Sequence, residues 1–227
     1  MAVALLAVGG KADSADLRLP LDIAASEQTK LDRIAENASV KTRVEGEPFL
    51  SRRDVFEYLL DHPAFASHVT QALLLARLRI WPTPDGLFLD EGWGTTGVFR
   101  VLHAEPGRRV IYARGQHRIA VLPPIAGEAV VSIEYRYAPG AERRDLVMTT
   151  VAAFVKLDSR ILASMLKLTS AVAQRKADRE ASSLVRLFAK VSRAIEDDPA
   201  GVYAKLRERT DVPQANLEEF RIRLGVR

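Results

Sequence analysis

The four histidines of this 227-residue chain are the side chains best suited to proton transfer or metal binding. His62, His68, His103 and His117 form neither an HExxH motif nor any i, i+4 pair, so the sequence predicts no metal site. His103 and Glu134 could act as an acid and a base if both faced one cavity. Glu134, however, alternates with apolar positions and is expected to point outward. We therefore assign no catalytic residue and expect no cofactor.

Other catalytic signatures are missing as well. With no cysteine, the chain can form no disulfide, thiolate zinc site or cysteine nucleophile. It has no GxSxG, GxxxxGK[ST] or GxGxxG motif. Its nearest glycine-rich stretch, Gly92, Gly94 and Gly97, contains Trp93 and opens no helix, which indicates a hairpin turn and not a phosphate-binding loop. The sequence thus offers no catalytic motif, and it leaves open whether the protein is an enzyme.

Composition favours one main domain, and the distribution of charge bears on two kinds of partner, membranes and nucleic acids. The chain is 48% apolar and carries 33 basic against 29 acidic residues. Basic residues gather in 100–118 and 159–193, which would favour contact with an anionic membrane surface; ordinary solvated faces are the alternative. No nucleic acid partner is expected, because the C-terminal tail is only slightly basic and short. The oligomeric state and the identity of a ligand are left open.

The first ten residues, MAVALLAVGG, are apolar but far short of the roughly 20 residues that span a bilayer. One interpretation is the remnant of an export signal; a locally packed N-terminus is the other. An exported or periplasmic location is therefore the expectation, and a cytoplasmic one the alternative. We divide the chain into a lead-in (1–35), a main domain (36–197) and a helical tail (198–227).

The periodicity of apolar residues predicts a strand, two helices and then a series of strands. Val40, Thr42 and Val44 alternate as in a half-buried strand. Ser51 suits the cap of a first helix, and Pro63 suits the first residue of a second. Strand-like segments separated by Gly or Pro turns follow at 77–81, 87–93, 98–103, 109–114, 119–122, 129–137 and 146–157. The 129–137 segment should have one dry and one wet face, and 146–157 should be covered on both.

A long helical pattern begins at Asp158 and runs without Pro or Gly to Asp197. The apolar residues of its two halves point in different directions, which predicts a bend or a change of partner. The stretch 173–183, whose apolar members are alanines, is expected to leave the sheet. Two short amphipathic segments follow in 202–227.

This order resembles the helix-grip fold of the START-like or SRPBCC superfamily, which includes bacterial polyketide cyclases and lipid-transfer domains. The resemblance covers 37 to about 195 and includes the segments DEGWGTTGVFRVL (90–102) and AVVSIEYRY (129–137). It implies an α+β fold in which a curved antiparallel sheet wraps around a long C-terminal helix, with two short helices after the first strand. It also implies a cavity for a hydrophobic small molecule such as a lipid.

Aromatic, methionine and arginine side chains are the expected lining of that cavity. Tyr135 and Tyr137 are the strongest candidates, because a buried phenol needs a hydrogen-bond partner that a ligand can provide. Binding of a hydrophobic molecule is thus the expected function. The alternatives are a cyclase-like or hydrolase-like enzyme of the same fold, and an interaction domain whose cavity is filled. The complete predicted lining is Trp81, Trp93, Phe99, Tyr112, Arg114, Tyr135, Tyr137, Met148, Phe154 and Met165.

Overall fold

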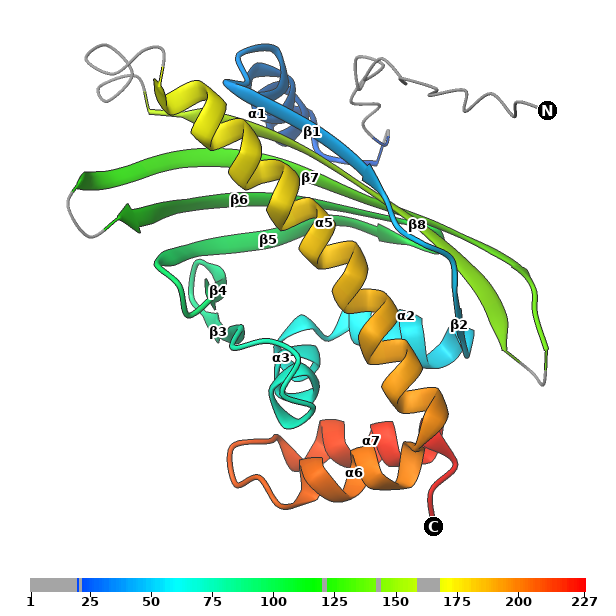
Figure 1. Cartoon of the computed structure of the whole chain (residues 1–227). Helices are drawn as coiled ribbons and strands as arrows, with labels where there is room; N and C mark the ends of the chain where they lie inside the picture. Colours follow the sequence, from blue (N-terminus) through cyan, green and yellow to red (C-terminus); the bar gives the residue numbers. More distant parts are fainter. Residues whose placement is uncertain (1–19, 21, 120–121, 142–143, 159–167) are drawn as a thin grey trace, which may run out of the picture.

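The chain folds as an α+β protein in which a curved antiparallel sheet lies against a long helix (Figure 1). The computed structural model describes residues 20, 22–119, 122–141, 144–158 and 168–227. In chain order the elements are α1 (Ala25–Glu36), β1 (Val40–Glu45), β2 (Phe49–Ser51), α2 (Arg53–Asp61), α3 (Pro63–Ala72), β3 (Arg79–Thr83), β4 (Gly86–Asp90), β5 (Thr95–Glu105), β6 (Arg108–Ile119), β7 (Leu122–Pro139), β8 (Asp145–Leu157), α5 (Leu168–Asp197), α6 (Pro199–Arg207) and α7 (Gln214–Leu224).

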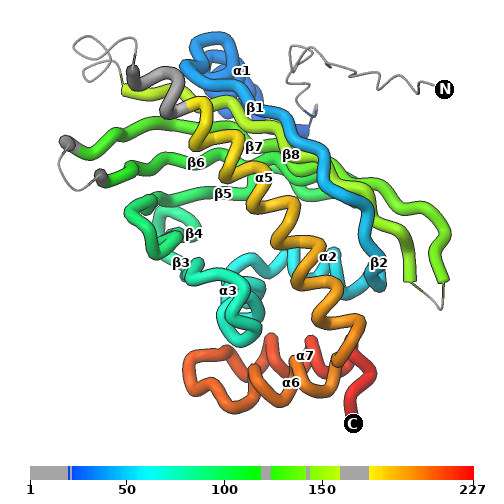
Figure 2. Tube along the Cα trace, viewed as in Figure 1, coloured from blue at the N-terminus to red at the C-terminus, as the bar shows by residue number. Residues whose placement is uncertain are grey.

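The strands are arranged in the order β1-β8-β7-β6-β5-β4-β3, and the short β2 also pairs with β8. The two faces of the sheet have different helical neighbours. Helix α5 packs against β1, β2 and β8 on the face that we call the inner face, whereas α1 packs against β7 and β8 on the opposite, outer face. Figure 2 traces α5 across the sheet toward the C-terminal helices. The α+β class, the curved sheet and the long helix are as predicted.

Each sheet face has its own apolar core. On the inner face, Phe56 of α2 and Val185 of α5 pack against Ile133 and Val151. On the outer face, Leu31 and Ile34 of α1 pack against Val110, Tyr112 and Val130. The face of β7 that was expected to be wet is therefore covered in its middle: Val130 and Ser132 are both buried. That prediction was wrong because helix α1, which lies within the expected lead-in, covers it.

Other local predictions also differ from the structure. Ser51 does not cap a helix but ends β2, and α2 begins at Arg53 without a side-chain cap. The segment 119–122 is not a strand of its own, since Ile119 ends β6 and Leu122 begins β7. Within 173–183, Ala181 is buried against the sheet and does not leave it. Helix α3 does begin at Pro63. The expected helix start after Asp158 and the bend of that helix involve 159–167, outside the described residues.

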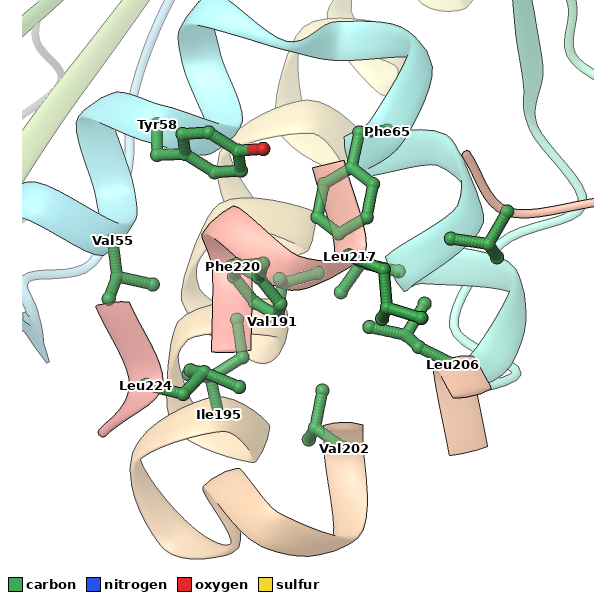
Figure 3. Packing of buried hydrophobic residues seen from close by; sticks show 12 residues of the cluster. Val55, Tyr58, Phe65, Val191, Ile195, Val202, Leu206, Leu217, Phe220 and Leu224 are labelled. Carbon is green, nitrogen blue, oxygen red and sulfur yellow. The ribbon is translucent and has the colours of Figure 1, made fainter. Parts of the chain in front are cut away.

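A third apolar core joins the C-terminal tail to the rest of the chain (Figure 3). Phe220 of α7 is completely buried and contacts the rings of Tyr58 and Phe65 from α2 and α3. Ile195, near the end of α5, belongs to the same cluster. Asp198 accepts a hydrogen bond from the Gly201 backbone N–H and so caps α6. The tail therefore anchors the far end of α5.

Candidate functional site

A buried polar network on the inner face links α2 to the sheet. Arg109 of β6, which is only 4% exposed, donates from Nη2 to Glu57 Oε2 at 2.8 Å and to Asp61 Oδ1 at 2.7 Å. Its Nη1 donates to the Tyr135 hydroxyl at 2.7 Å and to the backbone oxygens of Glu105 and Arg108. A fully engaged guanidinium has no hydrogen left for a ligand. Arg109 therefore acts as a structural cation that holds α2 on the sheet.

The two tyrosines on this face are satisfied by the protein itself. Tyr135 donates to Glu57 Oε2 at 2.5 Å, and Tyr137 donates to Glu57 Oε1 at 3.0 Å. Burial raises the pKa of Tyr135, and its hydrogen bond to Glu57 raises it further. Burial and the charge of Glu57 likewise raise the pKa of Tyr137. Both phenols are thus neutral hydrogen-bond donors at physiological pH, and the partner that was expected from a ligand is Glu57.

An open groove of about 670 Å³ borders this network and is partly lined by it. Arg53, on its rim, pairs with Asp145 at 3.1 Å and lies 4.4 Å from the centroid of the Tyr137 ring. The polar groups of Arg109 and Tyr135 are used up in contacts within the network. The groove therefore presents mainly the charges of its more exposed lining residues to solvent. It is lined by Arg53, Asp54, Glu57, Asp61, Ala104, Glu105, Pro106, Arg109 and Asp145.

The predicted cavity-lining residues are divided between the two faces of the sheet. Tyr135, Tyr137 and Phe99 are on the inner face. Directly paired residues of neighbouring strands share a face, so Phe154, paired with Val130, is on the outer face with Tyr112. Tyr112 donates to Glu128 at 2.6 Å, and burial, followed by that hydrogen bond, raises its pKa to about 12.

The remaining predicted residues do not converge on the inner face either. Arg114 is exposed and lies on the outer face, as does the half-buried Met148. Trp81 and Trp93 are exposed. Met165 lies outside the described residues. The structure therefore does not bring the ten residues together, and only Phe99, Tyr135 and Tyr137 remain on the face that α5 covers.

The two halves of the inner face differ in burial. One half, which we call the closed half, is largely buried, and the other is only partly buried. Toward α2, the side chains of Ile133, Tyr135, Val147 and Val151 are buried. Further along the sheet, the inward-facing residues are aliphatic or glycine, and none of them is fully buried: Ile111, Ala113, Gly115, Gly127, Ala129, Val131, Ala153 and Val155. We call these eight residues the inner floor. It is an apolar surface beside α5 that the protein only partly covers.

Gly97 and Gly115, a directly paired couple on this face, mark a close approach of two strands. A Cβ atom added at Gly97 would lie 2.7 Å from the Arg114 backbone oxygen, and one at Gly115 would lie 2.6 Å from that of Thr96. Such contacts are closer than real Cβ atoms tolerate. Glycine is required at both positions because neighbouring strands approach closely there.

A chain of polar contacts joins α5 to the strands beside the inner floor. Lys176 of α5 lies 3.4 Å from Glu91 Oε1, which accepts a 2.5 Å hydrogen bond from Thr95 Oγ1. Thr95 Oγ1 is also 3.0 Å from His117 Nδ1. Burial lowers the pKa of His117, and the charge of Lys176 lowers it further. We call these four residues the polar end. A hollow of about 320 Å³ is lined by Lys176 together with Arg175, Arg179 and Glu180.

The proposed acid–base pair His103 and Glu134 is not assembled. A register shift between Val101 and His103 places His103 opposite Val110 on the outer face. Its Nδ1 is 2.9 Å from Asp22 Oδ2. Glu134 instead lies near the guanidinium of Arg43, at 3.8 Å. Because the two side chains have separate partners and His103 faces away from α5, this pair provides no support for catalysis on the inner face.

Glu57, Arg109, Lys176 and Glu91 were not identified from the sequence. Arg109 stands within a basic segment, and Glu57 lies in a helix beside other charged residues. The sequence held one weak indication for Arg109: in the alternating pattern of its strand, Arg109 occupies a position whose side chain faces the core. Without knowing which helix covers that face, the sequence could not supply its partners.

Comparisons with known proteins add little. No family model matches the chain, and no curated protein of related sequence was found. A solved structure of a conserved protein from Geobacillus kaustophilus is similar to it at 11% identity and a TM-score of 0.39. The alignment covers 70% of this chain and 93% of the other. A similarity of that size carries no argument about function.

Among the described residues, no helix is both long and apolar enough to cross a membrane. Their His, Asp and Glu side chains form no group of three or more that could hold a metal ion.

Proposed function

We propose that this protein is a noncatalytic, START-like module with a helix-grip arrangement that binds a hydrophobic small molecule, such as a lipid, on the inner floor. The observation that carries the proposal is the incomplete burial of the inner floor beside α5. Apolar side chains that face a helix within a folded domain are normally buried, and partly exposed apolar surface next to a few polar groups is typical of ligand sites.

The polar end gives such a ligand a preferred orientation. Lys176 pairs with Glu91 and Glu180 and keeps a third ammonium hydrogen to donate. Thr95, whose one hydroxyl hydrogen goes to Glu91, can accept a hydrogen bond. A molecule with an apolar body and one carboxylate or hydroxyl would place its apolar part over Ala113 and Ala129 and its polar group near Lys176. We therefore propose an amphipathic ligand in preference to a pure hydrocarbon.

An interaction domain with a filled interior is the second candidate. The observation that favours it is the closed half of the inner face, where Phe56, Ile133 and Val185 pack without a described hollow. An enzyme of the same fold has less support, because the tyrosines with the most perturbed pKa values already bond to Glu57 within the protein.

The test is the recovery of a bound molecule from the purified full chain. Native mass spectrometry and solvent extraction should reveal a copurifying lipid-like ligand, and a fluorescent fatty acid should bind. Ala129→Phe, which fills the inner floor, should reduce probe binding, whereas Arg136→Phe should not, because Arg136 is exposed on the outer face of the same strand. Thermal unfolding would establish that both variants fold. If the wild type neither copurifies with a ligand nor binds the probe, the second candidate is favoured.

A further inference from the structure

Both tryptophans of the chain are exposed, and both lie at the β3–β4 end of the sheet. Trp93 is 70% exposed and Trp81 is 40% exposed, although tryptophan is among the residues that are most buried on average. Trp81 lies in the edge strand β3, and Trp93 in the turn between β4 and β5. Neither contributes to an apolar core cluster of the described residues. Their exposure therefore calls for an explanation other than packing.

The strand register places Trp81 at the end of a continuous row on the outer face. Trp81 is paired with Phe88, Phe88 with Val98, and Val98 with Arg114. Neighbouring strands lie about 4.8 Å apart, so the row spans roughly 14 Å from Trp81 to Arg114. Arg79 and Asp90 form the adjacent pair on β3 and β4. Trp93 follows directly beyond the end of β4.

Arginines surround these aromatic rings. The guanidinium of Arg79 lies 5.9 Å from the Trp81 ring centroid, and that of Arg77 lies 4.8 Å from the Trp93 ring centroid. We call Arg77, Arg79, Trp81, Phe88, Trp93, Val98 and Arg114 the tryptophan face. Asp90, its main acid, is already paired with Arg79 at 2.9 Å.

Two of its arginines are available to an anion. Arg77 and Arg114 are exposed, and neither has an ion-pair partner among the described residues. The nearby Arg118 shares both properties. Exposed tryptophan together with unpaired arginine matches the boundary between lipid headgroups and acyl chains, where indole rings concentrate and cations meet anionic phosphates.

We propose that the tryptophan face docks this protein on the surface of an anionic lipid bilayer. Trp81, Phe88 and Trp93 enter the headgroup layer, and Arg77 and Arg114 bind lipid phosphates. This inference does not rest on the proposed ligand, because the row of Trp81, Phe88, Val98 and Arg114 lies on the face of the sheet opposite the inner floor.

Two observations disfavour other occupants. Single-stranded nucleic acid binds by stacking bases on free aromatic faces, but Phe88 lies against Trp81 at 4.8 Å between centroids, with the two rings inclined by 33°. Arginines lie near both indole rings, Arg79 at Trp81 and Arg77 at Trp93. A second copy that added a strand to β3 would meet Pro82, which has no backbone N–H to donate. A lipid surface needs neither a free ring face nor a free strand edge.

The two tryptophans allow membrane binding to be followed by intrinsic fluorescence, without an added label. Fluorescence of the full chain should shift to shorter wavelength, and iodide quenching should fall, on addition of phosphatidylcholine vesicles that contain phosphatidylglycerol. Pure phosphatidylcholine vesicles should cause little change, and added salt should reverse the shift. Trp81→Phe and Trp93→Phe each leave one reporter, and both variants should still show the shift.

Charge-reversal variants locate the contact. Arg77→Glu/Arg114→Glu should lower the vesicle partition coefficient at least 25-fold, since losing one arginine costs about fivefold. Lys190→Glu/Arg193→Glu makes the same charge change at exposed positions of α5 and should retain most of the binding. Circular dichroism would verify the fold of both.

Several results would overturn the proposal. One is the absence of a shift with anionic vesicles; another is an equal loss of binding in both double variants. A shift that appears with protein concentration alone would instead assign the tryptophan face to self-association. A shift with a single-stranded oligonucleotide but not with vesicles would assign it to nucleic acid.

Discussion

Replacing Arg109 with methionine tests whether the network between α2 and the sheet stabilises the fold. The change removes a cation whose side chain is 5% exposed and leaves Glu57, Asp61 and Tyr135 without their shared donor. Methionine keeps much of the aliphatic volume, so the loss is chiefly electrostatic. The structure therefore predicts destabilisation without a large cavity.

The expected size follows from the burial of the partners. Removing one member of a fully buried ion pair costs about 3–5 kcal/mol, because the other charge remains buried. Here Glu57 and Asp61 are 20% and 47% exposed, so water compensates part of the loss. We expect the free energy of unfolding to fall by about 3 kcal/mol. For a chain of this length, that corresponds to a melting temperature lower by about 6–12 °C.

Urea unfolding followed by circular dichroism measures this quantity, with Arg53→Met as the matched control. Arg53 belongs to the same groove, but its side chain is 59% exposed and its pair with Asp145 should contribute about 0–1 kcal/mol. In a double-mutant cycle, Arg109→Met and Glu57→Gln should couple by about 0.5–3 kcal/mol. The reasoning is refuted if Arg109→Met is no more destabilising than Arg53→Met.

Three further predictions concern other parts of the fold. Phe220→Ala should lower the free energy of unfolding by about 3–5 kcal/mol in urea titrations, because a fully buried ring joins the tail to α2 and α3; a loss below about 1 kcal/mol would mean that the tail packs loosely. Gly97→Val should lower the melting temperature more than Gly225→Ala, since only the Gly97 site places the added Cβ against backbone, whereas Gly225 has φ +68° but open space; equal shifts would contradict the close strand approach. Burial lowers the pKa of His68 below its ordinary value of 6.5, so the unfolded chain binds the proton more readily and stability should decline as pH falls below about 6.5. Comparing unfolding at neutral and acidic pH, His68→Gln should show a smaller decline than the wild type, and an unchanged decline would refute the role of His68.

Local sequence patterns predicted much of the fold. Alternation identified β1 and β7, the run of apolar residues identified β8, and Pro63 marked the start of α3. These signals are local because strand and helix periodicity depend on nearest neighbours along the chain. The predictions failed where a distant element intervened, as when α1 covered Val130 on β7.

The candidate sites were harder to predict. The alternation of Tyr135 and Tyr137 with charged residues correctly indicated a covered face, but Glu57, their partner, comes from a helix about 80 residues earlier in the chain. The exposure of Trp81 and Trp93 contradicted the usual preference of tryptophan, and no local pattern distinguishes an aromatic ring at a sheet edge from one in a core.

The sequence by itself determined the order of most strands and helices and the absence of cysteine chemistry. Tertiary structure alone decided which face each strand turns toward α5, which charges meet Arg109 and which apolar residues remain uncovered. The physical reason is one of range. Backbone preferences act over a few residues, whereas burial and ion pairing depend on segments that are brought together only when the chain folds.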